Sequence, residues 1–521
     1  MTQFVQPIAA IRGGETALID QLGSVTWCEF NERCNRLVHA FRALGLGSGD
    51  TIAIFAGNCS EYFEAMMAAT HCGLTYVPVN WHFSAEELAY VIANSGAKLL
   101  LTEDQFLDTA ENAVNRNETP ELAHLVAVRG NHRVQRFEDY ETLLDGQSKD
   151  EPADQSLGGP MFYTSGTTGR PKGVKGSTFA AGGSLAMMEM IGAGMSQMLN
   201  ISNTGTTYLC GPVYHSAQWA FSFLPLLAGS RILMRNRFDA AESLQLIDEF
   251  KVTNSHLVPT QFHRLLRLED NVKRSFSGAS LEVIWHGAAP CPPEVKRRMI
   301  DWWGPVISEY YGSTEGAIVT TVDSPAWLAH PGTVGKATAT AEITIRDDAG
   351  NVLPTGEAGQ IYVKSLTGSD FEYHNEPEKT ASVHLEPGTY TFGDIGYLDE
   401  DGYLYLSDRK IDMIISGGVN IYPAEIEAVL LTHPAIEDAA VFGIPNEEFG
   451  EEIKAAVTVT AGVSADDDLS QSIMTHCRRH LAGYKTPRSI DYEESLPRQE
   501  TGKLYKRLLR DRYWKEAGRS I

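Results

Sequence analysis

The sequence lacks several features that would each point to a particular class of protein. Its cysteines are odd in number and never stand in a C-x-x-C pair, which argues against a disulfide framework or a zinc site. They are Cys28, Cys34, Cys59, Cys72, Cys210, Cys291 and Cys477. Positive charge is scarce, since 43 Lys and Arg stand against 67 Asp and Glu and give a formal net charge of −24. We therefore expect no nonspecific nucleic-acid binding and no general attraction to anionic lipid.

Long apolar runs are also missing. No stretch reaches the length needed to cross a membrane, and the first residues, Met-Thr-Gln-Phe-Val-Gln-Pro, contain no basic segment followed by an apolar core. A cytoplasmic protein with no membrane partner is expected. The chain is long, however, and 521 residues with an apolar content of 43% are enough for two or three folded units.

The first part of the chain alternates short apolar runs with helical patterns, which is typical of βαβ units. Ser84 and Glu87 have the spacing of a capping box, and Gly96 marks the end of the helix that follows. Residues 140–159 are polar and rich in turn residues, so a surface loop is expected there. Strands are expected at residues 51–55, 74–79, 98–102, 254–258, 281–285 and 306–310.

The pattern changes twice further along the chain. From Thr333 the apolar period becomes two, as in antiparallel strands, and around Asp408 the alternation of strands and helices returns. The expected fold class is therefore α/β. A large N-terminal domain, residues 1–408, would combine parallel-rich α/β sheets with a β-rich subdomain, and residues 409–521 would form a small α+β C-terminal domain. Loops at the carboxyl ends of the parallel strands should line the ligand crevice.

The stretch Tyr163-Thr-Ser-Gly-Thr-Thr-Gly-Arg-Pro-Lys172-Gly-Val has the composition of a phosphate cradle. Its small residues let backbone N–H groups turn inward, its hydroxyls add donors, and Lys172 adds a positive charge. An apolar strand end precedes it, and residues after Ser177 have a helical pattern. Most Gly/Ser/Thr clusters are solvated turns, but a bias sustained over this length favours polyphosphate. The common nucleotide-loop pattern G-x-x-x-x-G-K-[ST] is absent, so another ATP-binding architecture is needed.

Other stretches are weak signals when taken singly. Residues 309–316, Glu-Tyr-Tyr-Gly-Ser-Thr-Glu-Gly, place an aromatic ring, a hydroxyl and a carboxylate close together, but could be a tight turn. Residues 285–290 could approach a flat ring or form an ordinary strand-to-helix turn. Asp394 and Arg409 would be turn and surface residues, the glycines after Ser416 would lead into a helix, and Lys503 would be solvated.

Together, in their order and spacing, these blocks resemble the adenylate-forming enzymes: acyl-CoA synthetases, luciferases and peptide-synthetase adenylation domains. The resemblance covers nearly the whole chain and is strongest to bacterial acyl-CoA synthetases at 481–488 and 501–507. It implies ATP, Mg²⁺ and coenzyme A as cofactors, with a carboxylic acid as substrate. It also implies that the C-terminal domain is mobile about a hinge near residues 409–412.

The resemblance assigns a role to each matching residue. Lys503 would bridge the carboxylate and the α-phosphate, Thr314 would contact the α-phosphate, and Glu315 would bind Mg²⁺. The phosphates would be held by Thr164, Ser165, Gly166, Thr167, Thr168, Gly169 and Lys172. Adenine would be framed by Gly287, Ala288, Ala289, Pro290 and Tyr311, and the ribose or phosphate would be contacted by Asp394 and Arg409. After domain rotation, Gly417 and Gly418 would line a thiol tunnel.

The substrate and the acceptor are less sharply defined. The block at residues 212–219 resembles the one that carries a gating aromatic residue in this family, placed at His215, although a histidine capping the next helix is an equal reading of the residues alone. The acyl pocket is expected among Trp219, Phe221, Trp285, Tyr310, Ala317 and Ile318. This apolar and aromatic lining favours a hydrophobic, aryl or fatty acid.

Two alternatives to a CoA ligase stay open. Ile411 stands where relatives usually have a polar hinge residue. The alternative function is therefore that of an amide synthetase, which passes the acyl group to an amine. A nucleotide-binding sensor without catalysis is less favoured, because Lys503, Glu315 and the cradle are intact. A homodimer is expected only because some members of the family that the sequence resembles form dimers.

Overall fold

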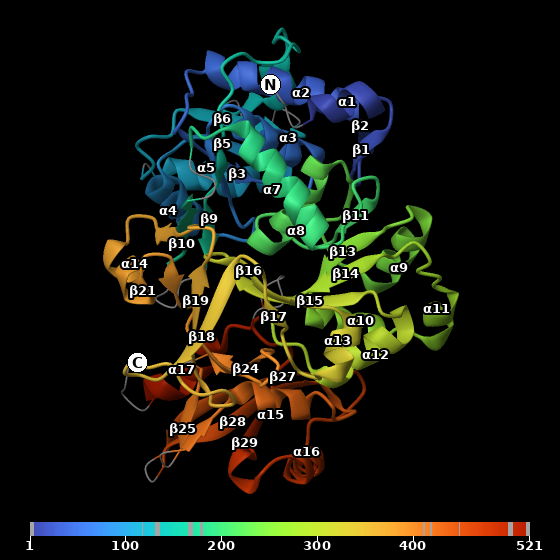
Figure 1. The fold of residues 1–521 in the computed structure, drawn as a ribbon, viewed down its shortest axis with the longest axis vertical. Helices are drawn as coiled ribbons and strands as arrows, with labels where there is room; N and C mark the ends of the chain where they lie inside the picture. Colours follow the sequence, from blue (N-terminus) through green and yellow to red (C-terminus); the bar gives the residue numbers. More distant parts are fainter. Residues whose placement is uncertain are drawn as a thin grey trace.

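The computed structural model describes residues 5–116, 118–130, 136–164, 170–177, 181–409, 412–416, 419–446, 449–498 and 504–516, without the side chains of 408, 409, 420, 515 and 516. The structure has three parts, which are a pair of large α/β sheets, a β-rich subdomain and the C-terminal domain. In Figure 1 the first large sheet lies at the top, the second large sheet lies below it to the right with the β-rich subdomain to the left, and the C-terminal domain lies at the bottom. The described helices include none that is long and apolar enough to cross a membrane.

The first large sheet is parallel throughout, in the order β7-β6-β5-β3-β4-β8. Its strands are β3 (Thr51–Phe55), β4 (Thr75–Pro78), β5 (Ala97–Glu103), β6 (His124–Val128), β7 (Glu138–Asp139) and β8 (Gly159–Pro160). The helices between and beside them are α2 (Trp27–Ala43), α3 (Ser60–His71), α4 (Ala85–Ser95), α5 (Leu107–Asn115) and α6 (Tyr140–Leu144). The predicted start and end of α4 are confirmed: Ser84 and Glu87 form a capping box, and Gly96 adopts φ 66° at the C-cap.

The second large sheet has the order β17-β16-β15-β14-β13-β11-β12-β1-β2 and is parallel from β1 to β15. Its strands are β1 (Thr16–Ile19), β2 (Ser24–Thr26), β11 (Thr206–Leu209), β12 (Arg231–Met234), β13 (Asn254–Leu257), β14 (Val283–His286), β15 (Ile307–Ser313), β16 (Ala317–Val322) and β17 (Lys336–Ala337). The accompanying helices are α1 (Gln6–Arg12), α7 (Leu185–Met198), α8 (Ser216–Ala228), α9 (Ala240–Glu249), α10 (Pro259–Leu266), α11 (Asp270–Ser275), α12 (Pro293–Trp303) and α13 (Ser324–Ala329).

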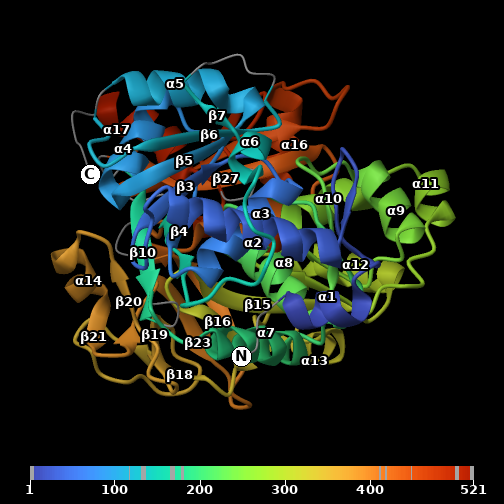
Figure 2. The ribbon, with the colours of Figure 1, turned by 90° about the horizontal axis from the view of Figure 1, so that it is seen from above.

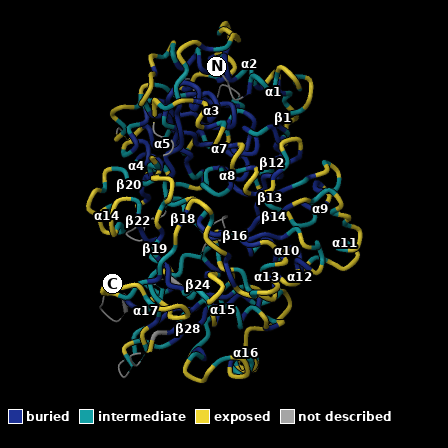
Figure 3. Tube along the Cα trace, in the orientation of Figure 1, coloured by how far each residue is buried: buried dark blue, intermediate teal, exposed yellow. Residues whose placement is uncertain are grey.

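Helices α2, α3 and α8 are sandwiched between the two sheets (Figure 2). Their side chains form one core with Ile52 and Ile54 of the first sheet and Leu18 and Ile232 of the second. The outer face of the first sheet is covered by α4 and α5, and that of the second by α9, α10 and α12. Figure 3 shows the buried trace following the strands and α3. Because helices cover both faces of each large sheet, the sequences of the strands are nearly continuous apolar runs.

The β-rich subdomain combines two small sheets. One contains β9 (Phe162–Thr164), β10 (Lys172–Gly176) and β20 (Phe371–Tyr373). The other contains β18 (Ala341–Arg346), β19 (Gly359–Ser365), β21 (His384–Glu386), β22 (Thr389–Tyr390), β23 (Asp394–Leu398) and β24 (Leu404–Arg409), with α14 (Pro377–Val383) beside them. The predicted change to antiparallel strands is confirmed here.

The C-terminal domain is a sheet covered by helices. Its strands are β25 (Ile414–Ser416), β26 (Val419–Ile421), β27 (Ile436–Asn446), β28 (Gly450–Val459) and β29 (Ser489–Tyr492). Its helices are α15 (Pro423–Leu430), α16 (Asp467–His480) and α17 (Lys506–Glu516). A separate apolar core joins α15 and α16 to β27 and β28.

Two local predictions need correction. Residues 140–159 are not all surface loop, because Tyr140 begins α6, is buried, and donates a 2.7 Å hydrogen bond to the Glu64 carboxylate. The polar composition concealed that Tyr140, Leu143 and Leu144 are the buried residues of one helical turn. The cradle is also not followed directly by a helix: β10 pairs antiparallel with β9, and α7 begins only at Leu185.

Candidate active site

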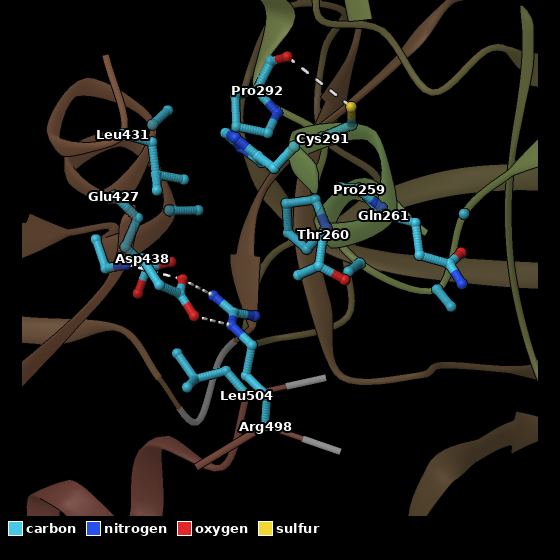
Figure 4. Close-up of a pocket in the computed structure, with 18 of the residues that line it drawn as sticks. Pro259, Thr260, Gln261, Cys291, Pro292, Glu427, Leu431, Asp438, Arg498 and Leu504 are labelled. Atoms are coloured by element: carbon cyan, nitrogen blue, oxygen red, sulfur yellow. Dashed lines mark hydrogen bonds and ion pairs between the residues drawn. The ribbon is translucent and has the colours of Figure 1, made fainter. Parts of the chain in front are cut away.

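A cavity of about 1340 Å³ lies between the carboxyl ends of the parallel strands of the second sheet and the C-terminal domain. Loops after β11, β13 and β14 form one wall, and α15 and the chain around Arg498 form another. Figure 4 shows Pro259, Thr260 and Gln261 of the first wall opposite Asp438 and Arg498 of the second. Parallel strands bring their carboxyl ends to one edge of a sheet, which is why distant loops meet here.

Tyr311 and Asp394, predicted to contact adenine and ribose, lie together in this cavity. The Tyr311 hydroxyl donates a 2.7 Å hydrogen bond to the Asp394 carboxylate, and both residues are buried. The Phe392 ring meets the Tyr311 ring at an edge, with 5.9 Å between centroids. The predicted adenine loop lines the same cavity with Gly287, Ala288, Ala289 and Pro290. A flat ligand entering here would therefore meet both the loop and the Tyr311 ring.

Arg409 is the register partner of Asp394 in the β23–β24 pair, so its backbone lies beside the proposed ribose contact. Its side chain is outside the described residues.

Lys172 occupies the first position of β10, opposite Thr164 of β9. Its side chain is buried. Burial, together with the neighbouring ammonium of Lys379, lowers the pKa of Lys172 to about 8. An anion at this place would favour the charged form of the amine. The other predicted cradle residues, Ser165, Gly166, Thr167, Thr168 and Gly169, lie outside the described residues.

Glu315 and Thr314 follow β15, close to the cradle strands. A Glu315 carboxylate oxygen accepts a 3.0 Å hydrogen bond from the Tyr373 hydroxyl on β20, which itself pairs with β10. The hydroxyls of Thr314 and Ser216 lie 2.7 Å apart. No group of three or more His, Cys, Asp or Glu within the described ranges could hold a metal. One carboxylate fits Mg²⁺ nevertheless, because this ion commonly takes its other oxygens from substrate phosphates and water.

His215, the predicted gating residue, is the N-cap of α8. Its Nδ1 accepts a 3.3 Å hydrogen bond from the backbone N–H of Ala217. The structure thus shows a capping role, and a gating role stays a prediction.

The predicted acyl-pocket residues fall into separate groups. Phe221, Trp285 and Tyr310 belong to one buried cluster, with ring centroids of Phe221 5.2 Å from Tyr310 and 6.1 Å from Trp285. Ile318 packs partly against it, while Ala317 is exposed at φ 55°. Trp219 does not join this cluster: its indole N–H donates to the Tyr76 hydroxyl, and its ring stacks on Phe223. Positions two apart on a helix point to nearly opposite sides, which separates Trp219 from Phe221.

Sequence reasoning missed two buried polar residues beside this cluster. Gln218 and His256 are connected to Tyr310 by hydrogen bonds, and both line a small cavity of about 10 Å³ that shares Gly211, Pro212, Gln261 and Ala288 with the large one. The available signal was His256 itself, a titratable residue within a strand that is buried on both faces.

The described residues on either side of Lys503 line the large cavity. Lys503 lies outside the described residues, but Arg498 and Leu504 on either side of its segment pair as a β-bridge and line the cavity. The Arg498 guanidinium donates to both carboxylate oxygens of Asp438, at 2.6 and 2.7 Å (Figure 4). This bidentate contact anchors the start of the segment to β27.

The described residues that flank Gly417 and Gly418 do not line the large cavity. Gly417 and Gly418 lie outside the described residues, and the flanking Ser416 and Val419 are paired in the β25–β26 hairpin. Val419 is 45% exposed, and neither flanking residue lines the cavity. In this arrangement Arg498 and Leu504, rather than Ser416 and Val419, line the cavity.

Comparison with known proteins identifies the class. A family model described as AMP-binding enzyme matches residues 6–368, and one described as AMP-binding enzyme C-terminal domain matches residues 425–503. The chain belongs to the AMP-binding enzyme family. It is 32% identical over 513 residues to a feruloyl-CoA synthase from an Amycolatopsis species, covering 97% of this chain and 96% of that protein.

Two solved structures have the same fold over nearly their full length. An anthranilate CoA ligase in complex with anthranoyl-AMP superimposes with a TM-score of 0.89 at 24% identity, over 99% of this chain and 98% of that one. An amide bond synthetase from Marinactinospora thermotolerans gives a TM-score of 0.81 at 25% identity, over 98% and 99%. The predicted family and fold class are confirmed, and so is the predicted class of enzyme, an adenylate-forming acid–CoA ligase that uses ATP and CoA.

Proposed function

We propose that this chain activates a hydrophobic or aryl carboxylic acid with ATP and transfers its acyl group to the thiol of CoA. The observation that supports this most directly is the shared cavity. The adenine loop, the Tyr311–Asp394 pair and both ends of the Lys503 segment line it. A nucleotide bound by the adenine loop and the Tyr311–Asp394 pair would present its phosphates within reach of Lys503.

The first half-reaction joins two anions. A carboxylate oxygen attacks the α-phosphorus, the bond to the β-phosphate oxygen breaks, and pyrophosphate leaves an acyl-AMP. Lys503 would neutralise charge on the carboxylate and α-phosphate as they approach, and Lys172 would hold the outer phosphates. Mg²⁺, when bound by Glu315, would supply further positive charge to the phosphates. Preorganised charges of this kind are commonly worth on the order of 10²–10³ in rate.

The second half-reaction needs a different surface at the same place. The CoA sulfur attacks the acyl carbon, the bond to AMP breaks, and the thiol proton passes to solvent. Since Arg498 and Leu504, on either side of Lys503, line the cavity and the residues that flank the glycine turn do not, we assign the present arrangement to the adenylation step. Rotation about residues 409–412, which separate the two domains, would exchange the two segments.

The acid is assigned from the residues that surround Tyr310. Phe221, Trp285 and Leu199 are apolar and buried, which favours an aliphatic or aryl body over a small polar acid. The 32% identical relative is a feruloyl-CoA synthase, which is consistent with an aryl acid. A cytoplasmic location and a homodimer stay predictions.

The test is product analysis by mass spectrometry. The protein is incubated with ATP, Mg²⁺ and a panel of aliphatic, aryl and polycyclic acids, each with CoA or with mixed amines. We expect acyl-CoA, AMP and pyrophosphate from at least one acid. Absence of AMP and pyrophosphate with every acid would contradict the proposal.

A second candidate is amide formation. The amide bond synthetase shares the fold over nearly the whole chain, and Ile411 departs from the usual polar hinge residue. In that case the same panel would yield amides without CoA and little thioester.

A further inference from the structure

Three buried polar residues form a hydrogen-bonded chain beside the proposed acyl site. Gln218 lies on α8, His256 on β13 and Tyr310 on β15, and all are buried. The Gln218 amide nitrogen lies 2.9 Å from His256 Nδ1, and His256 Nε2 lies 3.0 Å from the Tyr310 hydroxyl. Such chains are unusual in an apolar core, because each member must be satisfied.

The donor and the acceptor of each hydrogen bond between these three residues follow from a further contact of Gln218. The Gln218 amide nitrogen also donates to the backbone carbonyl of His256 at 3.3 Å, and a carbonyl can only accept. This fixes the nitrogen, not the oxygen, of the amide toward the histidine. Burial, with the charge of nearby His215, lowers the pKa of His256 to about 3, so the ring is neutral. Its Nδ1 therefore accepts, its Nε2 carries the proton, and the Tyr310 oxygen accepts that proton.

This arrangement leaves the Tyr310 hydrogen available. Because the Tyr310 oxygen accepts from His256, its own O–H must donate elsewhere, and no hydrogen bond from it to another described residue is present. The Gln218 carbonyl oxygen likewise accepts from none of the described residues. Tyr310 lines the large cavity and Gln218 the small one. A buried donor without an acceptor is costly, so a ligand acceptor at this place would be strongly favoured.

Two glycines, Gly287 and Gly211, leave space for the side chains of Tyr310 and Gln218. A Cβ on Gly287 would lie 2.6 Å from the Tyr310 ring, and one on Gly211 would lie 2.5 Å from the Gln218 amide nitrogen. Phe221 packs against both the His256 and Tyr310 rings, at 4.8 and 5.2 Å between centroids. The Tyr310 hydroxyl is thus held in one position within apolar walls.

We propose that Tyr310 is a specificity-determining residue whose hydroxyl donates a hydrogen bond to an oxygen or nitrogen acceptor on the body of the acid. The substrate class is then an apolar or aryl carboxylic acid that carries such an acceptor, for example a ring hydroxyl, an ether or a ketone, rather than a plain hydrocarbon acid. This inference rests on the proposed acid-activating function. Gln218 and His256 act as positioning residues, because they direct the Tyr310 hydrogen toward the ligand.

The test compares matched pairs of acids, each a hydrocarbon acid and its analogue with one oxygen at a successive position. Pyrophosphate release gives kcat/KM with Mg²⁺ and saturating ATP. We expect the wild type to prefer one oxygenated acid by about tenfold or more over its hydrocarbon partner. Tyr310→Phe should remove that preference, because it should slow the oxygenated acid more than its hydrocarbon partner. Tyr208→Phe is the control, since it deletes a buried hydroxyl bonded to Ser243 in the same sheet but away from the cavity.

A second variant leaves Tyr310 intact. Gln218→Met keeps the length of the side chain and removes the N–H that fixes the histidine tautomer. His256 Nε2 can then accept the Tyr310 proton, so the preference for the oxygenated acid, measured as the ratio of kcat/KM within each pair, should fall.

Three results would overturn the inference. The first is equal slowing of both members of every pair by Tyr310→Phe. The second is a rise in the KM for ATP alone, which would assign the hydroxyl to the nucleotide. The third is a wild type without any preference within the pairs. Each still shows pyrophosphate release and so leaves the proposed function standing, whereas no release with any acid would reject both.

Discussion

Tyr311 in the second half of β15 and Asp394 at the start of β23 are joined by a 2.7 Å hydrogen bond from the phenol to the carboxylate. This bond ties the second large sheet to the β-rich subdomain at the cavity. It also brings an aromatic ring and a carboxylate together at the cavity, where we propose that they hold the base and the sugar of ATP.

Tyr311→Phe should therefore weaken nucleotide binding more than catalysis. The phenylalanine ring keeps the surface on which adenine would stack, but Asp394 loses the donor that orients it. We expect the KM for ATP to rise about tenfold, the scale set by loss of one hydrogen bond to a charged group, with kcat nearly unchanged. Steady-state pyrophosphate release at varied ATP measures this.

The matched control for that prediction is Tyr405→Phe. Tyr405 also donates to an aspartate of the same subdomain, Asp399, at 3.3 Å, but neither lines the cavity. An unchanged KM for ATP in Tyr311→Phe, or an equal rise in both variants, would contradict the assigned role.

The pH dependence of ATP use should report Lys172. Burial, with Lys379 nearby, lowers the pKa of Lys172 to about 8. The ammonium form is present below that pH and is lost above it, so kcat/KM for ATP should fall as the pH rises through about 8. Lys379→Ala removes the repulsion and should move this fall to higher pH. A fall at the same pH in wild type and Lys379→Ala would assign it to another group.

A buried ion pair between α12 and β15 should control stability. The Lys296 ammonium lies 2.7 Å from the Glu309 carboxylate and 4.8 Å from the centre of the Trp327 ring, and both charged groups are buried. Lys296→Met would leave the carboxylate unpaired, which typically costs about 3–5 kcal/mol. Denaturant unfolding measures the loss, and adding Glu309→Gln to the same variant should recover most of it.

Acidity supplies an internal check on that stability prediction. Burial already raises the pKa of Glu309 although Lys296 opposes the rise, so removing Lys296 should raise the pKa further. The penalty exists only where Glu309 is charged in the folded state. The deficit of Lys296→Met should therefore shrink as the pH falls through the raised pKa, and a deficit independent of pH would point to lost packing instead.

Local order along the chain was largely predictable from the sequence, while the meeting of distant residues was not. The capping box at Ser84 and the strand at β3 depend on neighbours in sequence. The contact between Tyr311 and Asp394 depends on how two subdomains pack, and only the family resemblance placed both at one nucleotide.

The predicted acyl-pocket residues also show that contacts between distant residues could not be predicted from the sequence. Trp219 and Phe221 looked equivalent as apolar helix residues, but helical geometry sends them to different cores. Gln218 and His256 were not predicted as site residues, because the sequence does not show which residue a polar side chain in a buried strand or helix hydrogen-bonds to. Their partner, Tyr310, is supplied by a strand two places along the sheet order from β13.

The central claim is that one chain performs two separate half-reactions and that Lys503 serves the first. Single-turnover measurement of wild type and Lys503→Ala tests it, using ATP and an accepted acid for acyl-AMP formation, and purified acyl-AMP with CoA for thioester formation. We predict that Lys503→Ala slows acyl-AMP formation by on the order of 10²–10³ and leaves thioester formation from supplied acyl-AMP close to the wild-type rate. Equal loss of both half-reactions would contradict the account.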